Sequence, residues 1–283
     1  MERQGARRRP KATLQAIASH AVLALAASLA LYPVLWLVFI SFKSKEQYLA
    51  GKLFLSWPLH LEPFSGALRG GRFFLWLMNS GILTTAAVLL CTAVAFLAAF
   101  ALAKMRFAGR RLFLDAIVSL MAIPIVVLIV PLFVLYTRLR LMSSYQGMIL
   151  MYAAVCLPFS VYLLTNFFKT IPDEIMEAAV IDGAPVFRIL TRVVIPLSGP
   201  PIVTLIVVNA VWVWNELLLA LVFLPKDGLR TLMVGITVFK SRFNLDISVT
   251  MAGLLLTTLP IVVLYIVFQK FFIRGLTEGA LKA

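Results

Sequence analysis

Acidic residues are scarce in this sequence and cysteines are nearly absent. The chain has 12 Asp and Glu against 26 Lys and Arg, which gives a net charge of +14. The two cysteines, Cys91 and Cys156, exclude a disulfide framework and a cysteine metal site. The sequence holds no Gly-x-x-x-x-Gly-Lys-Ser/Thr phosphate loop and no His, Asp and Glu cluster with catalytic or metal spacing. It therefore predicts a chain that is not an enzyme and holds no cofactor or metal of its own.

Charged residues of both signs are also few, and six long stretches hold none. Charged residues make up 13% of the 283 residues and hydrophobic residues make up 62%. Soluble domains, in contrast, are roughly 45–50% apolar. About 20 apolar residues in a helix cross the hydrocarbon core, and a helix satisfies its own backbone in lipid. The sequence predicts an all-α integral membrane protein whose six transmembrane helices are residues 12–42, 73–103, 116–137, 141–168, 193–215 and 247–269.

The excess of basic residues has two explanations, nucleic-acid binding or a position beside membrane spans on the cytoplasmic side. The second fits a chain this apolar. Basic residues gather before the first run, at Arg3, Arg7, Arg8, Arg9 and Lys11, and after the second, at Lys104, Arg106, Arg110 and Arg111. We expect both termini in the cytoplasm, with tails at residues 1–15 and 275–283 and a membrane domain at residues 16–274.

Two predicted helices carry residues of interest inside the membrane. Pro124 and Pro131 lie seven residues apart, which places them on one face of the third helix. In the fifth helix, Asn209, Trp212 and Glu216 follow one another at i, i+3 and i+7, beside Asn215. Amide, carboxylate and aromatic groups inside a span usually face a protein interior or a water-filled cavity. A pathway through the membrane lined by these residues is one interpretation; contact of Glu216 with a soluble partner, or a place at the membrane interface, is the other.

The loop at residues 170–196 is polar and still patterned as helix. Pro172 and the acids after it suit a first helical turn, Gly183 suits a helix end, and Pro185 suits a restart. The pattern predicts a helix–turn–helix with a small-residue face at Ile175, Ala178, Ala179 and Asp182 and an apolar stripe at Val186, Ile189, Leu190 and Val193. It is either a docking surface for a soluble partner or an interfacial linker whose stripe lies on lipid headgroups.

The same loop resembles a known signature. Glu177-Ala178-Ala179, then Gly183, then Val193, Ile195 and Pro196 are similar to the E-A-A–x3–G–x9–I–x–L–P motif of permease subunits in binding-protein-dependent ABC importers. Val193 and Ile195 are conservative departures from it. Similarity to the carbohydrate-uptake branch, and to the smaller permease of the maltose-type pair, extends to Asn79-Ser80, Trp214-Asn215-Glu216 and the ending Arg274-Gly275-Leu276-Thr277…Gly279-Ala280-Leu281-Lys282.

The resemblance implies the type I importer permease fold, in a bacterial or archaeal cell membrane. It implies that Glu177, Ala178, Ala179, Asp182 and Gly183 form a coupling helix in a cleft of a cytoplasmic ATPase dimer, which carries the ATP and Mg. Its other implied partners are a second, different permease and an extracytoplasmic sugar-binding protein. Two alternatives remain: the same architecture importing a sugar phosphate, polyamine or amino acid, and an autonomous secondary transporter or channel.

Overall fold

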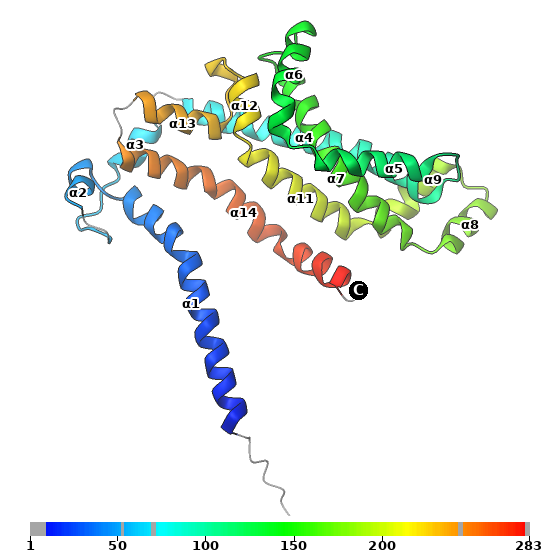
Figure 1. The fold of residues 1–283 in the computed structure, drawn as a ribbon, viewed down its shortest axis with the longest axis horizontal. Coiled ribbons are helices and arrows are strands. Elements are labelled where there is room, and N and C mark those ends of the chain that lie inside the picture. Colours follow the sequence, from blue (N-terminus) through cyan, green and yellow to red (C-terminus); the bar gives the residue numbers. More distant parts are fainter. Residues whose placement is uncertain (1–9, 52–53, 69–71, 243–245, 281–283) are drawn as a thin grey trace, which may run out of the picture. The chain divides into compact units, whose positions relative to one another are not determined.

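The computed structural model describes residues 10–51, 54–68, 72–242 and 246–280, and the side chains of residues 10–16, 238–242 and 270–280 are outside the description (Figure 1). Most of the predicted N-terminal tail and the last three residues, Leu281 to Ala283, therefore lie outside the described residues. The chain divides into two compact units. One comprises residues up to 69 and 240–256, and the other comprises residues 70–239 and 257–283.

All the regular elements in the described ranges are helices, which confirms the predicted all-α fold class. The first unit contains α1 (Pro10–Ser41), α2 (Lys45–Leu49), α3 (Glu62–Leu68) and the first turns of α14 (Ile247–Ala280). The second contains α4 (Arg72–Lys104), α5 (Arg110–Ser119), η1 (Leu120–Ala122), α6 (Ile125–Arg138), α7 (Tyr145–Lys169), α8 (Asp173–Ile181), α9 (Val186–Ile189), η2 (Leu190–Val194), α10 (Ile195–Leu197), α11 (Gly199–Asn215), α12 (Leu218–Phe223), η3 (Asp227–Leu229), α13 (Leu232–Arg242) and the rest of α14.

Among the residues that the structure describes, four helices are long and apolar enough to cross a membrane: Ile17–Ser41 within α1, α4, α7 and Ile247–Gln269 within α14. The described residues give six spans if two bent pairs are each counted as one. The pair Arg110–Ala122 and Ile125–Arg138 bends by 101°, and the pair Val186–Leu197 and Gly199–Asn215 bends by 78°.

The third span is broken at Ile123, so the prediction that Pro124 and Pro131 lie on one face of one helix is wrong. Ile123 is extended, with φ −85° and ψ 115°, because the residue before a proline avoids the helical region. Pro124 lies outside the helices as the N-cap of α6, whereas Pro131 lies within α6. The fifth span is interrupted in a similar way at Ser198, and prolines occupy the first turn of α11.

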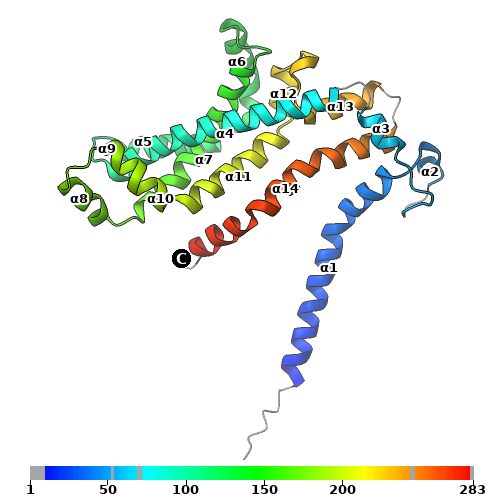
Figure 2. The ribbon, with the colours of Figure 1, turned by 180° about the vertical axis from the view of Figure 1, so that it is seen from behind.

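The core of the second unit forms where α4 packs along α7, with α11 beside both (Figure 2). Ala87, Cys91, Ala95 and Ala99 repeat every four residues along α4 and are buried. Small residues at this spacing let two helix backbones approach closely inside a membrane. Cys156 of α7 is also buried, so both cysteines lie in the core, as expected of small packing residues.

Candidate functional site

The first helix of the 170–196 loop has the predicted boundaries. Pro172 is the N-cap of α8, and Asp173 and Glu174 occupy its first turn, where the helix dipole favours acids. Gly183 follows the helix with a φ of +72°, a backbone conformation that glycine adopts at little cost. Its N–H donates to the Val180 carbonyl (2.9 Å), which closes the last turn. Sequence and structure agree here because all these signals are local.

The second half of the loop is anchored in protein. Pro185 is the N-cap of α9, which continues through the π-helical turn η2 into α10. Ile189 and Leu190 of the predicted stripe are buried in the core with residues of α4 and α7, while Val186 is exposed. A stripe that packs on the helices of its own chain does not lie on lipid headgroups, which disfavours the linker interpretation for this half.

The other side of the loop is open. Glu177, Ala178, Asp182 and Gly183 are exposed, and Ala179 is half-buried against the core. Two large apolar side chains project beside them: Ile181 is 85% exposed and Phe187 is 75% exposed. The loop therefore presents small, apolar and acidic groups together on one accessible surface.

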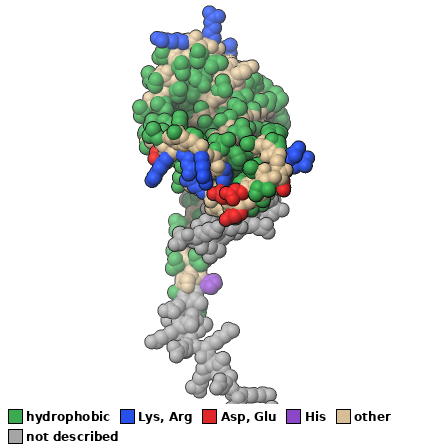
Figure 3. Space-filling model, turned by 90° about the vertical axis from the view of Figure 1, so that its right-hand side faces the viewer, with side chains coloured by type: hydrophobic (Ala, Val, Ile, Leu, Met, Phe, Trp, Pro, Cys, Tyr) green, Lys and Arg blue, Asp and Glu red, His purple; other side chains and the backbone are tan. Residues whose placement is uncertain are grey.

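The two halves of this surface carry opposite charge. The α8 segment holds only acids (Asp173, Glu174, Glu177 and Asp182), whereas α9 and η2 hold only bases (Arg188 and Arg192). Figure 3 views the molecule from this end and shows acidic side chains grouped near lysine and arginine side chains on a largely apolar surface. A partner that fits here has its own charges in the reverse order.

The start of the loop is tied to the end of α4. Lys104 donates to the Ile171 carbonyl (2.5 Å) and to the Asp173 carboxylate (2.6 Å). The hydrogen bond and charge of Lys104 lower the pKa of Asp173, so the carboxyl stays ionised to a lower pH than usual. The stabilisation from this pair is present above the unfolded carboxyl pKa of about 3.9 and is lost as the pH falls through the lowered value.

Two of the predicted pathway residues line one cavity. This cavity of about 590 Å³ lies among η1, α6, α7 and α11, and Asn209 and Trp212 form part of its wall. Its other lining residues include Tyr136, Met151, Pro158 and Phe159. An apolar and aromatic lining with a few polar groups is typical of small-molecule sites.

Asn209 is held in place by its neighbours. Its amide donates to Ser160 Oγ (2.9 Å), and Ser160 lies 3.2 Å from Cys91 Sγ. The ring of Trp212 meets the ring of Tyr152 edge to face, with centroids 6.2 Å apart. The sequence interpretation missed Ser160 and Tyr152, since no local pattern relates residues of α7 to residues 49 to 60 positions later in α11.

The prediction that Glu216 extends the face of Asn209 and Trp212 is wrong. The helix ends at Asn215, and Glu216 is extended, with φ −68° and ψ 123°. Its buried carboxylate accepts hydrogen bonds from the backbone N–H of Leu219 (2.6 Å) and Ala220 (3.0 Å) and from the Tyr152 hydroxyl (2.9 Å). Glu216 therefore caps α12. Asn215 is exposed and bonds within its own helix to the Val211 carbonyl (2.8 Å), so neither residue lines the 590 Å³ cavity.

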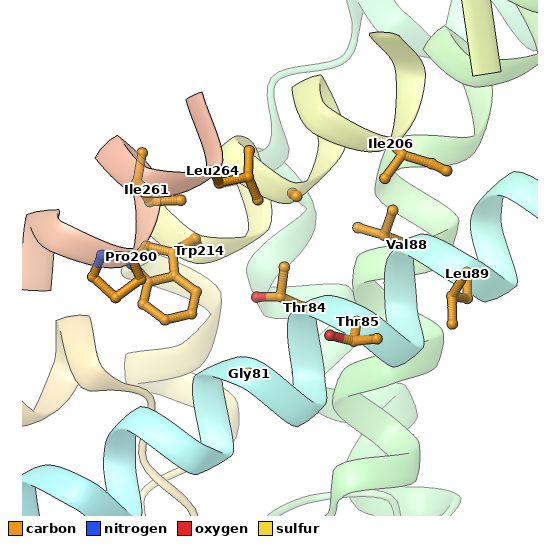
Figure 4. A pocket seen from close by; sticks show the side chains of 11 residues that line it. Gly81, Thr84, Thr85, Val88, Leu89, Ile206, Trp214, Pro260, Ile261 and Leu264 are labelled. Carbon is orange, nitrogen blue, oxygen red and sulfur yellow. The ribbon is translucent and has the colours of Figure 1, made fainter. Parts of the chain in front are cut away.

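A smaller cavity of about 230 Å³ lies between α4, α11 and α14 (Figure 4). Trp214 and Pro260 lie at one end of it, and Thr84 and Thr85 supply its hydroxyl groups. None of Asn209, Trp212, Asn215 and Glu216 lines this cavity. The larger cavity is therefore the better candidate for a pathway.

The chain is similar to known proteins in sequence and in fold. Residues 91–278 match the family described as binding-protein-dependent transport system inner membrane component. The chain is 37% identical to a putative ABC transporter permease, ORF2, of Caldicellulosiruptor sp. (strain Rt8B.4), over 88% of this chain and 91% of that protein. It is 34% identical to the trehalose transport system permease SugB of Mycobacterium tuberculosis (89% and 93%) and 34% to the sulfoquinovosyl glycerol transport system permease SmoH of Agrobacterium fabrum (89% of each).

A solved structure is similar along nearly the whole chain. It is the crystal structure of a bacterial ABC transporter involved in the import of the acidic polysaccharide alginate, with a TM-score of 0.83 and 25% identity, covering 95% of this chain and 100% of that one. The fold is thus that of an ABC importer permease, a transport subunit of the inner membrane. The chain belongs to the family of binding-protein-dependent transport system inner membrane components.

Proposed function

We propose that this chain is the permease subunit of an ATP-driven sugar importer and forms half of the translocation pathway. The observation that carries the proposal is the exposed helix–turn–helix at residues 170–196 in a chain of this family. Relatives named for trehalose and sulfoquinovosyl glycerol transport, and a structural neighbour for alginate import, support a saccharide as the solute. ATP hydrolysis takes place on a partner ATPase dimer, which holds the ATP and Mg.

In this proposal, the surface of α8 is the coupling surface. Glu177 and Asp182 supply charge to the ATPase, Ala178 and Ala179 permit close backbone approach, and Gly183 makes the turn. Ile181 and Phe187 add apolar contact area, since both are exposed beside these residues. The loop and both termini then lie in the cytoplasm, and the opposite ends of the spans face an extracytoplasmic sugar-binding protein. A second, different permease completes the pathway.

The pathway contribution of this chain centres on Asn209 and Trp212. Aromatic rings stack on the apolar faces of sugars, and amides bond their hydroxyls. The residues that the structure places around the cavity carry no charged side chain, which favours a neutral saccharide over an acidic one. An anionic solute is the second candidate, because the structural neighbour imports an acidic polysaccharide.

Co-purification tests the assignment directly. The tagged chain, expressed with its neighbouring genes, is expected to recover an ATPase, a second permease and a sugar-binding protein. If purified wild-type chain instead moves sugar across vesicles with no ATPase present, it is an autonomous transporter and the proposal fails.

We expect Trp212→Ala to lower sugar transport by at least about 5- to 150-fold, because even one methylene of apolar contact in a binding pocket is worth roughly 1–3 kcal/mol. Uptake by vesicles containing the assembled importer measures this, at several sugar concentrations. Trp212→Phe keeps a ring and is expected to retain most of the activity. A Trp212→Ala importer with wild-type uptake would remove Trp212 from the pathway.

A further inference from the structure

Helix α4 joins the loop at residues 170–196, which we call the coupling loop, to the opposite end of the second unit. It has 33 residues and no proline, whereas α7 and α14 each contain one. At 1.5 Å per residue it is about 50 Å long. Figure 2 shows it as one continuous helix from the region of α13 to the region of α9. Kinks in helices arise mostly at proline, at Gly/Ser pairs and at π-bulges; α4 has no proline and continues as one helix through Ser80-Gly81.

At one end of α4, the side chain of Lys104 bonds the start of the coupling loop, beside the apolar contacts that Ile189 and Leu190 make with the core. The Lys104 side chain is 7% exposed, and it donates to Ile171 and Asp173, the two residues that flank Pro172 at the start of α8. The Asp173 side chain, in contrast, is 72% exposed. A shift of α8 therefore pulls directly on the last turn of α4.

The other end of α4 holds residues 225–232, which we call the distal segment. Asn79 is buried, and its amide donates to the carbonyls of Gly228 and Arg230, both at 2.9 Å. Its carbonyl accepts from Tyr145 (2.5 Å), so every polar atom of this side chain is used. The next residue, Ser80, accepts from the Leu232 N–H at 2.8 Å.

Further contacts fix the same segment. Trp76 donates from its indole to the Asp227 carbonyl (3.0 Å), and Arg72 forms an ion pair with the Asp227 carboxylate. Gly235 lies so close to the Trp76 ring that an added Cβ would come within 2.1 Å of it. The distal segment thus follows the first two turns of α4 in position.

We propose that α4 is a strut that transmits movement of the coupling loop to the distal segment, with Lys104 and Asn79 as positioning residues at its two ends. The proposal rests on the proposed function, in which the ATPase meets the coupling loop and the distal segment lies on the side of the binding protein. Each state of the ATPase then presents a different position of the distal segment to the binding protein. Conversely, a loaded binding protein acts on the ATPase through α4.

The strut is tested in reconstituted importer. The quantity measured is the increase in ATP hydrolysis that sugar-loaded binding protein causes, which we call stimulation. Lys104→Met and Asn79→Leu preserve side-chain size and remove the anchoring bonds. Each is expected to reduce stimulation about 2- to 30-fold, the range seen for residues that carry coupling, while the ATPase still co-purifies. Lys104→Arg keeps the donors and is expected to retain stimulation. The matched control is Lys169→Met, at the exposed last turn of α7, which is expected to leave stimulation unchanged.

The double variant separates transmission from two local effects. Lys104 and Asn79 are 25 residues apart, about 37 Å along the helix, and effects of sites this distant normally combine independently. If both act through one strut, Lys104→Met with Asn79→Leu loses no more stimulation than the stronger single variant. Losses that multiply would overturn the proposal, and so would wild-type stimulation in either single variant.

Asp173→Ala removes the ion pair from its exposed partner and leaves Lys104 its bond to the Ile171 carbonyl, and it is expected to reduce stimulation as Lys104→Met does. Normal stimulation in Asp173→Ala and loss of the ATPase from Lys104→Met would together assign Lys104 to docking alone and overturn transmission. Failure of the proposed function is distinct, because the wild-type chain itself would then recover no ATPase.

Discussion

Replacing Ala178 with tryptophan is expected to reduce ATP-driven uptake to background while the binding protein still captures sugar. Ala178 is exposed on α8, and the proposed ATPase contact needs the helix backbone to approach closely there. A side chain of this size keeps the surfaces apart, and ATP then cannot shift the permease between its states, because a ligand shifts an equilibrium only through its differential contacts. Uptake and co-purified ATPase are measured together.

The matched control is Val180→Trp, which adds the same bulk to the same helix. Val180 is also exposed, and two residues of helix rotate it by about 200° from Ala178. Uptake is expected to persist in this variant. If Ala178→Trp transported sugar normally, or if both variants failed equally, the α8 face assigned to the ATPase would be wrong.

Gly183 tests the turn of the same loop. Gly183→Pro imposes a negative φ and removes the N–H that bonds Val180, so it is expected to abolish uptake as well. Gly183→Ala is milder: an added Cβ meets nothing within 4 Å, and only the positive φ opposes it, at roughly 1–2 kcal/mol. We expect uptake by the Gly183→Ala importer to be lower than that of the wild type and higher than that of the Gly183→Pro variant.

Glu216→Ala is expected to lower the midpoint of thermal unfolding in detergent by about 5–15 °C. The buried carboxylate accepts three hydrogen bonds, and its loss leaves two backbone donors of α12 and the Tyr152 hydroxyl without their acceptor. Unsatisfied buried groups cost roughly 1–3 kcal/mol each, so the three groups together cost about 3–4 kcal/mol at the low end of that range. For a chain of this size, each kcal/mol moves the midpoint by about 2–4 °C.

Two milder variants are expected to lower the midpoint of thermal unfolding by smaller amounts. Tyr152→Phe removes one hydrogen bond and keeps the α12 cap, so its midpoint is expected to fall least. Glu216→Gln keeps one acceptor oxygen and is expected to lie between the other two. An unchanged midpoint in Glu216→Ala would contradict the role of the carboxylate as a buried cap.

Local signals in the sequence predicted the coupling loop well. Pro172, the acids after it and Gly183 each act on their own turn of the chain, and α8 begins and ends where they indicate. The broken third span was not predictable in the same way. Pro131, Pro158 and Pro260 are accommodated within helices, whereas Pro124 ends one. The four have the same local chemistry, and only the surrounding fold separates them.

The pathway residues show a second limit. Extending the helical repeat of α11 by one residue placed Glu216 with Asn209, and the break after Asn215 separates them. The partner of Glu216 across the core is Tyr152, which lies 64 residues earlier. Contacts over such separations depend on how the helices pack, and periodicity within one segment carries no information about that.

The length of α4 makes its position sensitive to the thickness of the surrounding lipid bilayer. Hydrocarbon about 30 Å thick cannot cover a helix of 33 residues along its full length, so α4 tilts or projects beyond the hydrocarbon. Both anchored ends, at Asn79 and Lys104, belong to this one rigid element. A bilayer with longer or shorter acyl chains changes the tilt of α4, and in the proposed importer this hydrophobic mismatch then acts on the ATPase side and the binding-protein side at once.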